Sequence, residues 1–179
     1  MKIKFQVVLL AFMLLLANGA KAVETGDKAP PFRIVSGDDK VMTLDALKGK
    51  VVLLFYETRS VIEKNRNAKE ALKDWYHGLS PSLQAAVISI PVVNCSSAGL
   101  FKGMWKKGLR DSTGKEGLTI YGDWDGRMRV DYGFADRESN FMVLDKDSTI
   151  RCKKSGLIED ADLQNITKLL NQLVGGQGG

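Results

Sequence analysis

Thiols are the side chains of this sequence with the greatest chemical potential. The chain holds two cysteines, Cys95 and Cys152, and they are too far apart in sequence to form a C-x-x-C pair. A cysteine reacts as a thiolate, and disulfide exchange needs a second thiol within reach. His77 is the only histidine, which leaves little for a catalytic relay or a histidine-rich metal site. Any thiol chemistry would therefore depend on one cysteine acting alone.

Ser60 and Glu63 form a second pair whose spacing could support chemistry. They follow the apolar run from Val51 to Tyr56, which predicts a strand buried on both faces, and they open a helical pattern that reaches Trp75. A serine hydroxyl acts as a nucleophile only with an activating base. The same spacing is typical of a capping box, in which both side chains accept backbone N–H groups at a helix start. We therefore predict a cap rather than a catalytic pair.

Other site motifs are missing from the sequence. Asp123 and Asp125 are predicted to lie in a turn and lack the remaining ligands of a calcium loop. The chain has no C-x-x-C-H for haem, no glycine-rich phosphate loop and no G-x-S-x-G elbow. We predict no metal and no cofactor.

The N-terminus has the pattern of a secretory signal. Two lysines precede an apolar run of 13 residues, Phe5 to Ala17, and an A-x-A site ends at Ala22. As a helix, this run would reach about 20 Å, short of the roughly 30 Å hydrocarbon core of a bilayer. We predict a signal peptide at residues 1–22, export to the periplasm, no membrane span after cleavage, one domain at residues 23–174 and a flexible glycine-rich tail at residues 175–179.

The charge of the chain depends strongly on that segment. The whole chain has 26 basic and 21 acidic side chains, a formal charge of +5, and three of the lysines lie in residues 1–22. Their removal leaves 23 basic side chains against 21 acidic ones, or +2, which argues against nucleic-acid binding. A local basic run remains, interleaved only with Phe101 and Trp105, and we interpret it as a solvated face. Its members are Lys102, Lys106, Lys107, Arg110 and Lys115.

Strand and helix patterns alternate along the remaining chain. A hairpin comes first, the last two strands form a second hairpin, and a helix closes the domain, which indicates an α/β fold with a mixed central sheet covered on both faces. The predicted strands are 32–35, 41–44, 51–56, 85–93, 118–121, 141–144 and 149–152, and the predicted helices are 60–77, 99–109, 127–132 and 160–174.

Five short motifs, in order, resemble those of redoxins, a branch of the thioredoxin-like superfamily that includes the AhpC/TSA-like proteins. They are Gly26–Phe32, similar to G-x-x-A-P-x-F, then Leu47–Leu53, Asp123–Gly126, Tyr132–Phe134 and Asn140–Asp147. Each motif is weak alone, but their order is informative. The resemblance implies a three-layer α/β/α sandwich with a mixed central sheet and an N-terminal β-hairpin.

A closer resemblance is to the periplasmic YtfJ-type proteins, a thioredoxin-like group. It involves Ser60, Glu63–Asn65, Glu138–Ser139 and Val143–Asp147. In active redoxins, a thiol pair lies between the first core strand and the following helix. Here Ser60 and Glu63 occupy the two cysteine positions, and the loop at Asp136–Asn140 lacks the proline of active members.

These departures favour a protein without catalysis, a binding or accessory protein of the periplasm. The alternative is a redoxin-like thiol oxidoreductase or peroxidase that uses Cys95 alone. The strand order 2-1-3-4 implied by the resemblance would place Cys95 and Cys152 about 14 Å apart, too far for a disulfide, which needs Cα atoms within about 7 Å. Cys95 lies before a possible helix start, a place that can lower a thiol pKa, but it has no resolving partner and we favour an inert thiol.

A polar groove is the remaining candidate site. Arg59 and Glu57 are predicted to lie on a loop above the strand ends, without a packing role. Together with Thr58, Glu138 and Ser139 they are predicted to line a groove that binds a peptide or a small ligand. The sequence does not identify this partner, which would be an unknown periplasmic protein or small molecule.

Overall fold

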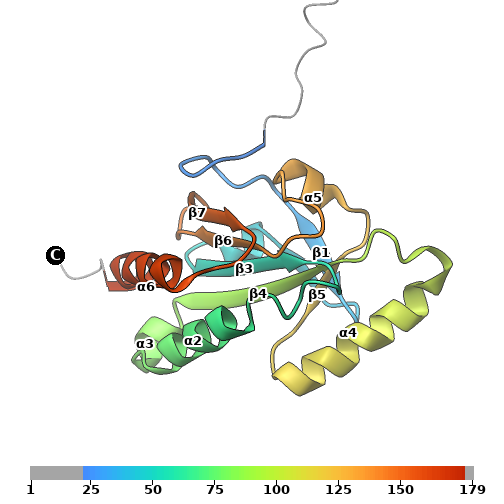
Figure 1. Cartoon of the computed structure of the whole chain (residues 1–179), viewed down its shortest axis with the longest axis horizontal. Coiled ribbons are helices and arrows are strands. Elements are labelled where there is room, and N and C mark those ends of the chain that lie inside the picture. Colours follow the sequence, from blue (N-terminus) through green and yellow to red (C-terminus); the bar gives the residue numbers. More distant parts are fainter. Residues whose placement is uncertain (1–21, 176–179) are drawn as a thin grey trace, which may run out of the picture.

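The computed structural model describes residues 22–175, and its centre is one mixed sheet of seven strands in the order β2-β1-β5-β4-β3-β6-β7 (Figure 1). Strand β3 runs parallel to β4, and β4 runs parallel to β5, whereas the other neighbours are antiparallel. The strands are β1 Arg33–Ser36, β2 Val41–Thr43, β3 Val51–Glu57, β4 Val87–Asn94, β5 Tyr121–Asp123, β6 Asn140–Leu144 and β7 Ile150–Ser155.

Helices cover both faces of this sheet. The helices are η1 Asp45–Leu47, α2 Arg66–His77, α3 Pro81–Gln84, η2 Gly99–Phe101, α4 Lys102–Glu116, α5 Arg127–Asp131 and α6 Asp160–Gly175. Figure 1 shows α2 and α6 on one side of the sheet and α5 on the other. The predicted α/β sandwich with an N-terminal hairpin is therefore confirmed.

Strand β3 is the centre of the core. All seven of its residues are buried, because alternate side chains enter the two layers. Val52, Leu54 and Tyr56 pack on the face that carries α5. The intervening residues, with Phe55 among them, pack against Leu72 of α2 and the inward face of α6. A strand buried on both faces is what the continuous apolar run predicts.

The strand order implied by the resemblance is also observed, as β4-β3-β6-β7. Cys95 directly follows β4 and Cys152 lies on β7, with two strands between them. Both thiols are free, as predicted. The sheet therefore keeps the two sulfur atoms apart.

The capping-box prediction at Ser60 and Glu63 is wrong. The helix begins at Arg66, and residues 59–65 form successive turns, with the Val61 amide donating to the Thr58 carbonyl (3.1 Å). Glu63 forms an ion pair with Arg66 instead of accepting the Ser60 amide. The N-cap residue is Asn65, and its side chain makes no cap bond because it is bonded elsewhere in the core.

Smaller differences concern the second half of the chain. Helix α4 extends to Glu116 rather than to residue 109, and ends at Gly117 in the left-handed conformation (φ +66°). Strand β5 therefore begins only at Tyr121. The short helix α3, with Pro81 as its first residue, is not predicted by the sequence pattern. Gly175 belongs to α6 rather than to the tail.

The β1–β2 turn packs directly against α4 at Gly37. A Cβ atom on this residue would lie 2.5 Å from the Lys106 carbonyl oxygen and 2.9 Å from the Arg110 backbone nitrogen. Arg110 donates from Nη1 to the Gly37 carbonyl (2.8 Å), and Lys106 pairs with Asp39. The N-terminal hairpin thus fixes the position of α4.

The predicted signal peptide, up to residue 21, and residues 176–179 of the predicted tail lie outside the described residues. Among the helices of residues 22–175, none has the length and hydrophobicity that crossing a membrane requires.

Candidate functional site

Polar residues gather at one end of the apolar sheet. Glu57, Asn94 and Asp123 are the last residues of the parallel strands β3, β4 and β5. Asn140 opens the antiparallel neighbour β6, opposite Tyr56. In α/β sheets, sites form outside the carboxyl ends of the parallel strands. This end of the sheet is therefore the candidate site.

Glu57 was expected on a loop, but this expectation is wrong. It is the last residue of β3, and only 3% of its surface is exposed. Its Oε2 atom pairs with Lys69 Nζ of α2 at 2.6 Å, and Oε1 accepts the Ser139 hydroxyl at 2.6 Å. Ser139 is fully buried. Glu57 and Ser139 therefore lie beneath the surface and are bonded to each other. Lys69 supplies the cation and Ser139 the donor that a buried carboxylate needs.

Asn65 extends this buried network to two more segments. Its Nδ2 atom donates to the Ser139 hydroxyl and to the Gly156 carbonyl, both at 2.9 Å, and its Oδ1 atom accepts the Ile158 amide at 2.8 Å. Four hydrogen-bonding groups thus connect the end of β3, the start of α2, the loop before β6 and the segment after β7. We call Glu57, Asn65, Lys69 and Ser139 the carboxylate network.

Asn140 fixes the loop that precedes β6. Its Oδ1 atom accepts the Ala135 amide (2.9 Å) and the Ser155 hydroxyl (2.6 Å), and its Nδ2 atom donates to the carbonyls of Ala135 and Glu138, both at 3.0 Å. A side-chain amide therefore shapes this loop, whose sequence contains no proline.

A second buried group surrounds Asp123, which is 1% exposed. The Tyr56 hydroxyl donates to its Oδ2 atom at 2.9 Å, and the Cys95 amide donates to its backbone carbonyl at 2.9 Å. Burial raises the pKa of the Asp123 carboxyl above its ordinary value. Burial, followed by the charge of Asp123, also raises the pKa of the Tyr56 hydroxyl.

The same surroundings make Cys95 a poor nucleophile. Its side chain is 1% exposed. Burial, followed by the negative charge of Asp123, raises the pKa of its thiol to about 12, against a smaller opposing effect of Arg59. A thiol with this pKa holds almost no thiolate at neutral pH. The end of a strand before a helix does not lower the pKa here, because the thiol points into the core with α4 residue Leu109.

The exposed part of the site is smaller than the predicted groove. Thr58 and Ser60 lie with their hydroxyl oxygens 3.0 Å apart. Arg59 lies over the Trp105 ring of α4, with Cζ 5.5 Å from the ring centroid. Glu138 pairs with Lys64 across the loop. Of the five predicted groove residues, Thr58, Arg59 and Glu138 thus reach solvent, while Glu57 and Ser139 support them from below.

Buried Asn65, Asp123 and Asn140 and half-buried Lys69 were not identified as site residues from the sequence. A polar residue next to an apolar strand is a usable signal, as in Asn140 before Phe141–Leu144. Their partners could not be inferred, because those partners come from distant segments. No buried side-chain N or O atom of residues 22–175 lacks a partner, so the buried network is complete without a ligand.

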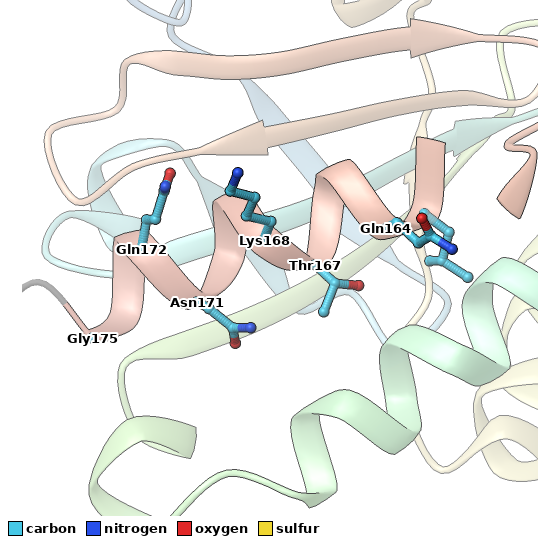
Figure 2. A pocket seen from close by; sticks show the side chains of 7 residues that line it. Gln164, Thr167, Lys168, Asn171, Gln172 and Gly175 are labelled. Carbon is cyan, nitrogen blue, oxygen red and sulfur yellow. The ribbon is translucent and has the colours of Figure 1, made fainter. Parts of the chain in front are cut away.

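A shallow depression lies elsewhere, along the outer side of α6 (Figure 2). Its labelled side chains leave the helix in different directions and do not converge on one point. Asn171, one of them, accepts the indole N–H of Trp75 at 2.8 Å. Residues 22–175 contain no group of three His, Cys, Asp or Glu side chains arranged to hold a metal ion.

Comparison with known proteins supports the fold. Neither a protein-family model nor a curated protein matches the sequence. Among solved structures, the thiol peroxidase of Chromobacterium violaceum matches with a TM-score of 0.63 and 13% identity, covering 88% of this chain and 90% of that one. The thioredoxin domain of a thiol-disulfide oxidoreductase from Bacteroides vulgatus matches with a TM-score of 0.61 and 18% identity, covering 84% and 100%.

An exposed lipoprotein thioredoxin of Streptococcus pneumoniae also matches, with a TM-score of 0.54 and 21% identity over 78% of this chain and 99% of that one. The chain therefore has the thioredoxin-like fold. At these identities, the likeness shows the fold alone, and the thiol chemistry in the names of these proteins belongs to them.

The carboxylate network predicts that substitution of two lysines, Lys69 and Lys64, lowers the free energy of unfolding by unequal amounts. Lys69→Met leaves the Glu57 carboxylate buried without its cation, which should lower the free energy of unfolding by about 2 to 4 kcal/mol. Lys64→Met breaks only the half-exposed pair with Glu138, which should cost about 0 to 1 kcal/mol. Urea unfolding followed by circular dichroism measures both. Equal losses in the two variants would contradict a structural role of the network.

Asp123 predicts a pH dependence of stability. Its folded-state pKa is raised, so its contribution to stability is complete below the unfolded pKa of about 3.9 and is lost as the pH rises through the folded pKa. Asp123→Asn keeps an acceptor for Tyr56 without the charge. We expect the variant to gain stability relative to wild type as the pH rises from 4 to 8 in urea unfolding. Asp136→Asn, at an exposed carboxylate, is the control, and parallel profiles for wild type and Asp123→Asn would refute the assignment.

Proposed function

We propose that this chain is an exported binding or accessory protein of the periplasm that uses the thioredoxin-like fold without thiol redox chemistry, and that it is closest to the YtfJ-type proteins. One observation carries the proposal. Ser60 and Glu63, which the resemblance to redoxins aligns with the thiol pair of active members, stand on a turn, and the only thiol at that end of the sheet is buried with a pKa of about 12.

Disulfide exchange has specific requirements that this site lacks. A thiolate must attack a sulfur atom, and a second thiol must resolve the mixed disulfide. Cys95 is shielded by α4, and Cys152 is two strands away. The Ser60 hydroxyl contacts another hydroxyl, that of Thr58, rather than a base, so it also lacks activation as a nucleophile.

The exposed residues above the carboxylate network are the proposed binding surface. Thr58, Arg59 and Glu138 stand on two segments that the buried residues Glu57 and Ser139 hold together. Their charges are of both signs, and Arg59 is preorientated by the Trp105 ring. Such a fixed polar surface suits a peptide or a small polar ligand, since groups already held in place lose less conformational entropy on binding.

Export is part of the proposal and rests on residues 1–22, with their lysines, apolar run and A-x-A site. The likeness to an exposed lipoprotein thioredoxin is compatible with it. After cleavage at Ala22, the domain would carry no membrane span.

The absence of thiol chemistry is tested with a variant that restores an exposed thiol. The wild-type chain should neither reduce insulin nor consume peroxide with dithiothreitol as reductant, and Cys95 should react with Ellman's reagent only on unfolding. In Ser60→Cys, the new thiol should react more than about a hundredfold faster than Cys95, because it is exposed and keeps an ordinary pKa near 8.5. Activity of the wild type that disappears in Cys95→Ser would instead establish the single-cysteine enzyme.

The binding surface is tested by substitution of its arginine. Wild-type protein immobilised on resin should retain a specific partner from periplasmic extract, identified by mass spectrometry. Arg59→Ala should reduce retention at least about tenfold, since a charged hydrogen bond contributes on the order of 1.5 to 3 kcal/mol. Arg151→Ala, an exposed arginine on the edge strand β7, should leave it unchanged. Equal retention by Arg59→Ala and wild type would remove the proposed surface.

A further inference from the structure

A second surface feature lies at the start of α4. Three large apolar side chains are exposed there: Leu100 completely, Phe101 to 66% and Met104 to 64%. Leu100 and Phe101 belong to η2, and Met104 follows in the first turn of α4. Their spacing of three and four residues places them on the same side of the helix. We call these three residues the apolar tip.

The tip differs from the other exposed apolar residues of the described chain. Those residues, Val41, Leu118, Val130 and Leu157, are separate in sequence, as is ordinary for a protein surface. A contiguous exposed group marks an interaction site more often than a chance exposure. From its sequence, this region was interpreted as a solvated basic face, because helical periodicity does not reveal whether another element covers the apolar side of a helix end.

Along the chain at the tip, the charged residues are all basic, although carboxylates outside this stretch pair with three of them, Arg110 with Asp38 among them (3.9 Å). From Ser96 to Arg110, the sequence contains four basic residues and no acidic one. Lys106 and Lys107 are paired with Asp39 and Asp111. Two further cations, Lys102 over the Trp124 ring at 5.1 Å and Arg59 over the Trp105 ring at 5.5 Å, take part in no ion pair among residues 22–175.

The tip also protrudes. Figure 1 shows the connection from β4 and the N-terminal end of α4 at the outer edge of the molecule. Farther along α4, the helix is held in place, since Arg110 donates a hydrogen bond to the Gly37 carbonyl of the N-terminal hairpin. The apolar tip is therefore presented outward from a rigid support.

We propose that the apolar tip and its surrounding cations bind the surface of an anionic phospholipid bilayer. Leu100, Phe101 and Met104 would enter the boundary between head groups and acyl chains, and Lys102 and Arg59 would contact the phosphate groups. Exposed Leu, Phe and Trp beside lysines are the usual composition of interfacial segments, and anionic lipids attract nearby basic side chains. The protein would lie on the membrane without crossing it.

Shape favours a bilayer over a protein as the occupant. A stable protein interface buries roughly 800 Å² on each partner in a complementary fit, whereas three side chains at a protruding helix end form a small convex surface. A lipid layer adapts to such a surface. This inference shares Arg59 with the proposed polar binding surface, but the residues that enter the lipid are different, and substitution of the tip leaves Arg59 in place.

Vesicle binding tests the proposal. The chain Val23–Gly179 contains every described strand and helix and omits the apolar N-terminal run, which would bind lipid by itself. It should cosediment with vesicles of equal parts phosphatidylglycerol and phosphatidylcholine, and at least tenfold more weakly with phosphatidylcholine alone or in 0.5 M salt. The triple substitution Leu100→Ser, Phe101→Ser and Met104→Ser should reduce binding to the anionic vesicles at least tenfold.

A matched control separates the tip from general hydrophobicity. Val41→Ser, Val130→Ser and Leu157→Ser together remove three exposed apolar residues elsewhere and should leave vesicle binding unchanged. Circular dichroism establishes that both triple variants are folded, as expected for exposed positions. Lys102→Glu should weaken binding to the anionic vesicles and leave binding to phosphatidylcholine unchanged.

Three results would overturn the proposal. They are no cosedimentation of the folded wild-type chain with anionic vesicles, undiminished binding by the tip variant, and equal losses in both triple variants. If the wild type ignores vesicles but self-associates in sedimentation velocity, and the tip substitutions abolish this association, the tip is an interface between copies of the chain. Retention or loss of partner capture by Arg59→Ala is a separate result, so the two proposals can fail independently.

Discussion

The ion pair between the buried carboxylate of Glu57 and the half-buried Lys69 is the constraint on which this end of the molecule depends. A carboxylate that is 3% exposed at the end of the central strand is stable only with a cation and donors around it. Lys69 and Ser139 supply them, and Asn65 holds Ser139 in turn. Two loops and the first long helix are thereby fixed around one charge.

This arrangement holds together the end of the sheet in a thioredoxin-like fold whose two cysteines are both free. The turn at residues 59–65 stays attached through the bond from Lys69 Nζ to the Ile62 carbonyl (2.7 Å), and Asn140 shapes the loop before β6. Polar groups that could have served a substrate are occupied by one another. The two surfaces proposed for interaction, at Arg59 and at the start of α4, are therefore exposed ones.

The sequence predicts the sheet well because its strands are apolar and its hairpins have clear turns, as in Phe141–Leu144 followed by the Asp145–Ser148 turn. It misplaces the first helix start, since Asn65 uses its side chain for long-range bonds rather than for a cap. Glu57 was wrongly expected on a loop, because its burial also depends on long-range bonds. Its partners lie 12 and 82 positions away along the chain, and local patterns contain no information about such contacts.

Gly37 has a consequence for any relatives of this chain. Because its missing side chain lets the hairpin backbone reach the Lys106 carbonyl, even alanine there would require α4 to shift or tilt. Homologues that orient this helix in the same way should therefore share glycine at the position, and those with a bulkier residue should hold it at another angle. The residue type at this one position of the first hairpin would then indicate, in an alignment of homologues, the orientation of α4.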